Sequence, residues 1–143
     1  MTIAPATPAD LPAVHALLTS CGLPVAGLAE HVRTALVARA GARIVGSAAL
    51  EVYGRHALLR SVAVDPAHRS TGLGQRLTAE ALALARAEGL SSVTLLTETA
   101  AGFFPKFGFV AVSRADVPAE VQASAEFAGA CPASAQAMRL DLA

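Results

Sequence analysis

A glycine-rich turn between an apolar strand and a long helical pattern is the segment of this sequence best suited to hold a ligand. The run Val62-Ala63-Val64-Asp65-Pro66 ends the strand, and Arg69-Ser70-Thr71-Gly72-Leu73-Gly74-Gln75 leads into the helix. Glycine lets the backbone approach a ligand closely, and the first N–H groups of a helix have no partners within it. With the positive end of the helix dipole, these amides favour a phosphate or pyrophosphate group, and Arg69 adds a counter-charge at the rim.

Two common nucleotide-binding loops do not match this turn. A Walker loop places Lys directly after its last glycine, whereas Gly74 is followed by Gln75. The Rossmann fingerprint needs a third glycine where this chain has Leu77, and its strand opens a βαβ unit rather than ending a meander. A third kind of phosphate-binding turn is therefore expected.

Apolar periodicity and turn residues give the elements that position this segment. Short links between strands predict an antiparallel meander, and the apolar, β-branched strand after the long helix is expected to lie parallel to the strand before it. The expected order is β-α-α-β-β-β-α-β-α-β-α-β, with helices over 7–22, 25–34, 72–88, 100–107 and 117–127 and, after the first strand, strands over 35–39, 43–52, 56–64, 93–97, 109–112 and 137–142. This predicts an α/β fold with a mixed central sheet, as one domain over residues 1–143.

Composition excludes several functional classes. The chain has 143 residues, of which 54% are hydrophobic, and its 11 basic residues balance 11 acidic ones. No global field attracts nucleic acid or an anionic membrane, and 4% aromatics without Trp disfavour base stacking. Cys21 and Cys131 have no zinc-ligand spacing, so no metal is expected, and free thiols are favoured over one long-range disulfide. With no signal-like start and no long apolar run, a cytoplasmic location is expected.

Two motifs together resemble a known family. The pattern Arg-x-x-Gly-x-Gly from Arg69 to Gly74 follows a Val-x-Asp-Pro strand end, and Phe103-Phe104-Pro105-Lys106-Phe107-Gly108-Phe109 comes downstream. This order resembles the GNAT superfamily of N-acetyltransferases. Further segments resemble the short N-acetyltransferases associated with arsenic-resistance operons, and similar ones occur in amino-acid N-acetyltransferases of the N-acetylglutamate-synthase type: 50–54, 58–64, 95–100, 124–127 and 131–135.

The resemblance implies a GNAT fold whose sheet splays at an acyl-CoA site, with acetyl-CoA as cosubstrate. It implies that the backbone of Val62-Ala63-Val64 pairs with the pantetheine arm and that Ser70 to Gln75, with Arg69, cradle the pyrophosphate. Phe103 is expected near the thioester arm, and Lys106 is expected to reach the CoA phosphates. The expected partner is a small-molecule amine, and the chain is expected to be a monomer or a homodimer formed through an exposed final strand.

Two positions depart from the family pattern. Many members carry a Tyr that protonates the leaving thiolate, and Phe104 stands at that position here. Thr97 replaces an Asn often found before that helix, which weakens a side-chain anchor for the pantetheine amide, but its hydroxyl stays a candidate anchor and a candidate substrate-binding group. Tyr53, the only tyrosine, is either a displaced proton donor or an amphipathic residue at a strand end.

Charged residues at strand ends are the candidates for proton transfer and acceptor binding. Glu51 and Glu98 are candidate general bases, with His56 a weaker one; the alternatives are solvated carboxylates and proton loss through water. Arg60 interrupts an apolar strand, and a buried guanidinium needs a partner. It either anchors an anionic acceptor or pairs internally with Glu51 or Glu98.

The sequence thus predicts an enzyme that acetylates a small-molecule amine, in resistance to arsenic or a related toxic metabolite. Three alternatives stay open: Nα-acetylation of an amino acid in biosynthesis, acetylation of a protein N-terminus, and a non-catalytic module that binds acyl-CoA. Thiolate capture of trivalent arsenic by Cys21 and Cys131 is disfavoured, because two distant cysteines make a poor soft-metal site.

Overall fold

Three consecutive strands joined by tight turns form the broad part of the sheet. In the computed structural model, which describes residues 1–142, β2 (Ala35–Ala40), β3 (Arg43–Tyr53) and β4 (His56–Val64) pair antiparallel. Gly41 and Gly54 make the two turns with φ of +63° and +64°, a conformation that glycine adopts without steric cost. The predicted meander is confirmed.

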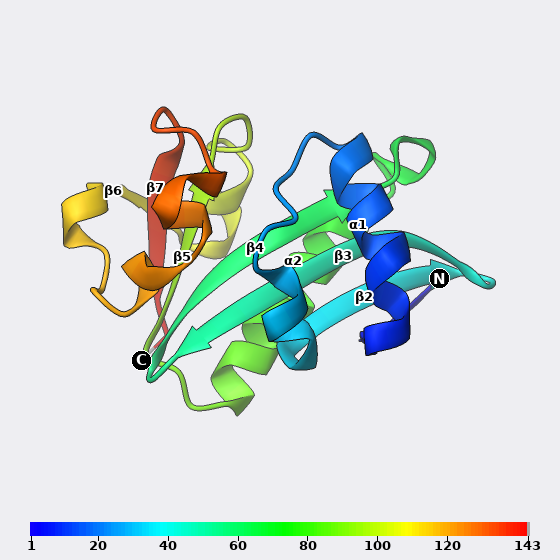
Figure 1. Ribbon diagram of the computed structural model, residues 1–143, viewed down its shortest axis with the longest axis horizontal. Helices are drawn as coiled ribbons and strands as arrows, with labels where there is room; N and C mark the ends of the chain where they lie inside the picture. Colours follow the sequence, from blue (N-terminus) through cyan, green and yellow to red (C-terminus); the bar gives the residue numbers. More distant parts are fainter. Residues whose placement is uncertain (143) are drawn as a thin grey trace.

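The remaining strands make the sheet mixed, and they place the last strand inside it. The strand order is β1-β2-β3-β4-β5-β7-β6 (Figure 1), in which β5 (Ser92–Thr97) runs parallel to β4 and the other pairings are antiparallel. Because β7 (Gln136–Asp141) lies between β5 and β6 (Val110–Val112), the expectation of an exposed final strand is wrong. In the described part of the chain the sheet edges are β1 (Thr2–Pro5) and β6.

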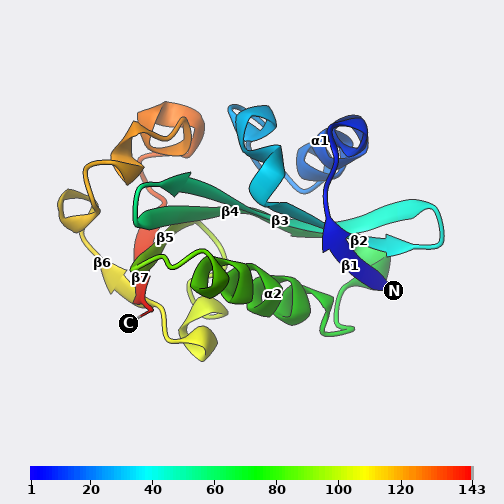
Figure 2. The ribbon, with the colours of Figure 1, turned by 90° about the horizontal axis from the view of Figure 1, so that it is seen from below.

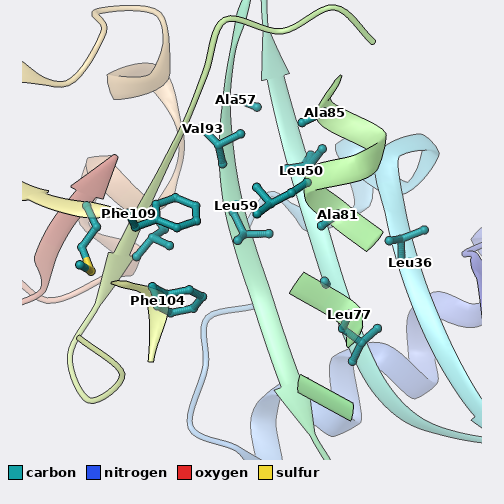
Figure 3. Close-up of a cluster of buried hydrophobic side chains, with 14 of the residues drawn as sticks. Leu36, Leu50, Ala57, Leu59, Leu77, Ala81, Ala85, Val93, Phe104 and Phe109 are labelled. Carbon is teal, nitrogen blue, oxygen red and sulfur yellow. The ribbon is translucent and has the colours of Figure 1, made fainter. Parts of the chain in front are cut away.

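One long helix covers each face of the sheet. Figure 2 shows α1 (Leu11–Ser20) on one side and α2 (Leu73–Ala87) on the other. The buried stripe of α2 packs on β3 and β4, with Leu77, Ala81 and Ala85 facing Leu50 and Leu59 (Figure 3). Each leucine buried here contributes roughly 1.5–3 kcal/mol relative to an exposed one, so this contact holds α2 against the sheet.

Three expected helices are shorter or differently wound than the sequence suggested. The segment expected as a helix over 25–34 is a 3₁₀ helix at Leu28–Thr34, and that over 100–107 is one at Phe104–Phe107. The helix expected over 117–127 is wrong: the structure has separate turns there, ending in a π-type turn at Glu126–Ala130. Local backbone features explain this, since Gly27 adopts a positive φ, Pro105 lacks the N–H that a helix over 100–107 would use, and the extended Ser124 ends the helical turns within 117–127.

The sheet opens between β4 and β5. These strands pair only from His56–Ser92 to Leu58–Thr94, after which β5 stays paired with β7 alone. Figure 1 shows the two strands starting side by side and then diverging. A bulge opposite Ala48 adds to the divergence, with Ser61 at a φ of +59°. The second half of β4 therefore has a strand partner on one side only.

Candidate functional site

A cavity of about 940 Å³ fills the opening between β4 and β5. Its walls are the second half of β4, the end of β5 and the loop that follows, and its roof comes from two segments distant in sequence. These are residues 21–24, after α1, and residues 126–135, before β7. The chain close to these two segments is in tight contact at Gly27 and Ala125, since a Cβ on Gly27 would lie 3.3 Å from the Cβ of Ala125.

The free edge of β4 turns backbone groups toward this cavity. The Asp65 N–H donates to the Val45 carbonyl on β3 (2.8 Å), whereas the Val64 carbonyl accepts from Arg69 Nε on the opposite side (3.1 Å). Because backbone direction alternates along a strand, the N–H and C=O groups of Val62 and Val64 both face the opening. An extended polar chain can pair there, as another strand would. Ala63 instead turns its backbone toward β3.

The first turn of α2 offers unpartnered amides beside that edge. Gly72 is the N-cap residue with a φ of +81°, and no side chain caps the helix. The first helical hydrogen bond runs from the Arg76 N–H to the Gly72 carbonyl, so the N–H groups of residues 73–75 have no helical partner. Ser70 also has a positive φ (+65°), and Arg69 is exposed at the rim. These donors and this cation fit the diphosphate of an acyl-CoA.

Phe103 and Gly74 narrow the passage between α2 and the β4 edge. A Cβ on Gly74 would lie 3.8 Å from Val64 Cγ2 and 3.9 Å from Phe103 Cζ. Exposed Lys106 holds its Nζ 5.0 Å above the Phe103 ring, whereas Phe104 is buried beside Phe109 in the core (Figure 3). Phe103 thus lines the cavity with its ring, and Phe104 presents no proton donor to it.

A buried ion cluster lies at the roof of the cavity. The Arg60 side chain is fully buried, with Nη1 2.7 Å from Glu51 Oε2 and Nε 3.2 Å from Glu126 Oε2. Its Nη1 also donates to the Ala26 carbonyl (2.6 Å) and its Nη2 to the Pro24 carbonyl (3.0 Å). Arg60 therefore holds β3, β4 and both roof segments together. The internal pairing with Glu51 is one of the two roles that the sequence left open, and the partner that the sequence did not suggest is Glu126.

The two carboxylates of this cluster ionise differently. Burial raises the pKa of Glu51, but hydrogen bonds from Arg60, Tyr53 and Ser124 outweigh it, so the pKa of Glu51 lies below its ordinary value. Burial also raises the pKa of Glu126, and there the opposing effects of Arg60 and the Cys131 thiol, 3.3 Å from Glu126 Oε1, are too weak to reverse the shift.

Two further groups are shifted by the same cluster. Burial and the hydrogen bond that Tyr53 donates to Glu51 Oε1 raise the pKa of Tyr53 to about 12. Burial and the neighbouring Glu126 raise the pKa of the Cys131 thiol to about 12. Both groups therefore stay protonated near neutral pH, and the cluster is left with one cation beside two carboxyl groups.

Of the other predicted site residues, some line the cavity and others lie away from it. Thr97 and the exposed Glu98 line the cavity at the end of β5, where Thr97 Oγ1 accepts from the Ala100 N–H (2.9 Å). Glu51 and Tyr53 lie behind Arg60 and do not line the cavity. His56 lies at the closed end of the β4–β5 pair, with Nδ1 2.7 Å from Ser92 Oγ.

Sequence reasoning did not single out Glu126 as a site residue. Its signal is weak: one acidic residue between Ala125 and Phe127, at the end of a segment expected to form a helix over 117–127. The π-type turn instead directs this carboxylate inward. Within residues 1–142 no group of three or more His, Cys, Asp or Glu side chains could hold a metal ion, and Cys21 and Cys131 are both free thiols. Over the same residues, no helix has the length and apolarity of a membrane span.

Comparison with known proteins identifies the family. The model of the acetyltransferase (GNAT) domain matches residues 31–111, more than half of the chain. The chain belongs to this family. An uncharacterized N-acetyltransferase of Chlorobaculum tepidum, CT2212, is 31% identical over 98 residues, which cover 68% of this chain and 63% of that relative.

Solved GNAT-fold structures superpose over the whole chain. Rv2747 from Mycobacterium tuberculosis, solved in complex with CoA and a second ligand, has a TM-score of 0.82 and 25% identity, with 100% of both chains covered. N-acetylglutamate synthase from Neisseria gonorrhoeae, complexed with coenzyme A and N-acetyl-glutamate, has a TM-score of 0.84 and 22% identity over 99% of this chain and 35% of its own. The second likeness shows the fold alone.

Proposed function

We propose that this protein is an acetyl-CoA-dependent N-acetyltransferase that acetylates the amine of a small molecule. One observation carries the proposal: the free backbone edge of β4 leads to the unpartnered amides at the start of α2. The family supports it, as does the likeness to Rv2747, a protein solved with CoA.

Three groups of residues would bind different parts of the proposed cosubstrate. The amides of residues 73–75, with Arg69, would hold the diphosphate. The backbone of Val62 and Val64 would pair with the amides of the pantetheine arm, and Phe103 would pack along it. When bound, acetyl-CoA supplies the acetyl thioester on which an amine can act.

The residues around the cavity also suggest how the chain assists the transfer. The backbone N–H of Val62 at the free edge of β4 can donate to a carbonyl oxygen as negative charge develops there. The buried Phe104 offers no proton to the departing sulfur. The cost is modest because a thiol has a pKa near 8.5, so its thiolate leaves without strong acid assistance.

The cover over one end of the cavity supports a small acceptor rather than a protein chain. Residues 126–135 and 21–24 cover the acceptor end, where a peptide would need an open groove. We propose toxic amino-acid-like amines, including arsenical amino acids, as the first acceptors to test. Glutamate, the acceptor expected of a biosynthetic enzyme, belongs in the same panel.

Two measurements test the proposed function. Isothermal titration with CoA tests the binding site, and thiol release from acetyl-CoA, corrected with a protein-only blank for Cys21 and Cys131, tests turnover across the amine panel. We expect CoA binding and thiol release with at least one amine. Binding without turnover on any amine would favour a non-catalytic acyl-CoA module, and no CoA binding would refute both.

A further inference from the structure

Resting on the proposed function, we propose that Glu126 binds the ammonium group of the acceptor and takes the proton that must leave before the nitrogen can attack. The starting point is the charge of the roof cluster. Arg60 lies between Glu51 and Glu126, 2.7 Å from one and 3.2 Å from the other, so the ionised cluster has one positive charge and two negative ones. A buried excess charge needs a proton or a cation to balance it.

The described side chains around the cluster do not supply that second cation to Glu126. The Nε, Nη1 and Nη2 atoms of Arg60 already contact Ser61 Oγ, Glu51, Glu126 and two carbonyls. His31 Nε2 lies 3.7 Å from Glu51 Oε1, on the other carboxylate. Arg114 donates to the carbonyls of Pro132 and Ala135. The balancing charge at Glu126 is therefore a proton in the empty site and an ammonium group in the occupied one.

Glu126 is also the carboxylate of the cluster that reaches the cavity. Glu126 and Cys131 both line it, together with Arg60, whereas Glu51 does not. The residue is only 3% exposed, so a cation that binds it must enter through the cavity. This places the acceptor nitrogen under the roof, opposite the open edge of β4.

The chemistry balances with one proton transfer at this carboxylate. A proton leaves the ammonium nitrogen for a carboxylate oxygen of Glu126, and the neutral amine forms the new C–N bond at the thioester carbonyl carbon while the C–S bond breaks. The second N–H proton ends on the departing thiolate, and Glu126 later returns its proton to solvent. The raised pKa of Glu126 suits this role, because a base works best when its pKa is near the working pH.

An NMR titration of Glu126 tests the binding step without any turnover. The carboxyl ¹³C signal, assigned with Glu126→Gln, is followed against pH with ethylammonium chloride and with tetramethylammonium chloride, which has no N–H to donate. Arg60, Glu51 and Cys131 face this group, Arg114 acts on the neighbouring Cys131 thiol, and the same charged groups are present in both salts. We expect ethylammonium to lower the titration midpoint by about one pH unit relative to the control cation. Equal midpoints in the two salts would overturn the proposal.

Kinetics test the proton transfer. Glu126→Gln is expected to lower kcat about 100-fold near neutral pH for a protonated amine, and Glu120→Gln, on the exposed surface of the same segment, is expected to leave it unchanged. The wild type should lose activity as the pH falls through the pKa of Glu126, which gives its pH–rate profile an acidic limb. The profile of Glu126→Gln should lack this acidic limb. 2,2,2-Trifluoroethylamine, which is neutral near pH 7, should react at similar rates with both proteins.

The outcomes separate this inference from the proposed function. If the wild type acetylates amines but Glu98→Gln removes the acidic limb instead, the transferase stands and Glu126 is not the base. A uniform loss of stability in Glu126→Gln, with an unchanged pH profile, would leave Glu126 a structural partner of Arg60. If no amine is acetylated, the proposed function fails on its own, and the NMR titration still decides whether Glu126 binds an ammonium group.

Discussion

Replacing Arg60 by Met removes the cation from the roof cluster and keeps a side chain of similar length. Removal of one partner from a buried ion pair typically costs 3–5 kcal/mol, because the other partner is left buried and uncompensated. Here the loss strands the Glu51 carboxylate, the Glu126 carboxyl group and two carbonyls that Arg60 now satisfies. We therefore expect the free energy of unfolding to fall by about 4–5 kcal/mol near pH 7, a large part of the stability of a domain this size.

The loss of unfolding free energy in Arg60→Met should depend on pH in a defined direction. In the wild type the pKa of Glu51 is below its ordinary value of 4.5, so its pairing contributes stability that is present above that pH and lost below it. The pKa of Glu126 is raised, so its ionisation opposes folding as the pH rises through that pKa. Without Arg60 the pKa of Glu51 loses its main lowering partner and rises, and the already raised pKa of Glu126 rises further. As the pH falls, protonation of the two carboxyl groups removes their unpaired buried charge in Arg60→Met. The loss of unfolding free energy in this variant should therefore be smaller near pH 5 than near pH 7.

Urea unfolding followed by circular dichroism measures this at both pH values. Arg43→Met is the matched control, because Arg43 Nη2 pairs with Asp65 Oδ2 at 2.6 Å but its side chain is 69% exposed. We expect that exposed pair to contribute at most about 1 kcal/mol. A deficit in Arg60→Met no larger than in Arg43→Met, or one that does not shrink near pH 5, would refute the account of the cluster.

Three further predictions concern single positions. Gly46→Ala should lower the free energy of unfolding by about 1–3 kcal/mol in thermal or urea melts, since the added Cβ would lie 2.8 Å from Leu77 Cδ1; an unchanged melt would contradict the packing of α2 on β3. Gly74→Ala should leave the free energy of unfolding unchanged or slightly raised, because the added Cβ meets protein atoms only at ordinary contact distance. It should weaken CoA binding about tenfold in calorimetry, because the Cβ enters the proposed pantetheine passage. Unchanged CoA affinity would show that the pantetheine arm does not pass Gly74. Tyr53 is the only tyrosine in a chain without Trp, so its titration can be followed by ultraviolet absorbance, and we expect a pKa of about 12. In Glu51→Gln this pKa should move back toward 10. Because the pKa is raised in the folded protein, stability should be lost as the pH rises through 12.

Much of the fold could be predicted because its signals are local. The turn glycines Gly41 and Gly54 and the apolar strands between them define the meander, and the apolar stripe of α2 defines its buried face. Gly72 and Gly74 at the start of α2 likewise identify the amide turn, since their positions relative to a strand end and a helix start are visible in the chain.

The roof of the site could not be predicted because it depends on contacts between distant segments. Nothing local indicates that Glu126 turns inward, since its direction follows from a π-type turn and from Arg60, which lies far away in the sequence. The place of β7 inside the sheet is equally non-local: a strand at the end of the chain resembles an edge strand until its neighbours are known. For Arg60, its place in an apolar strand indicates the need for a partner but not the choice between an internal carboxylate and an acceptor.

A crystal structure with CoA bound tests the central claim most directly. The account predicts diphosphate oxygens within hydrogen-bond distance of the N–H groups of residues 73–75 and pantetheine amides paired with the backbone of Val62 and Val64. A coenzyme bound elsewhere, with the opening between β4 and β5 vacant, would contradict it.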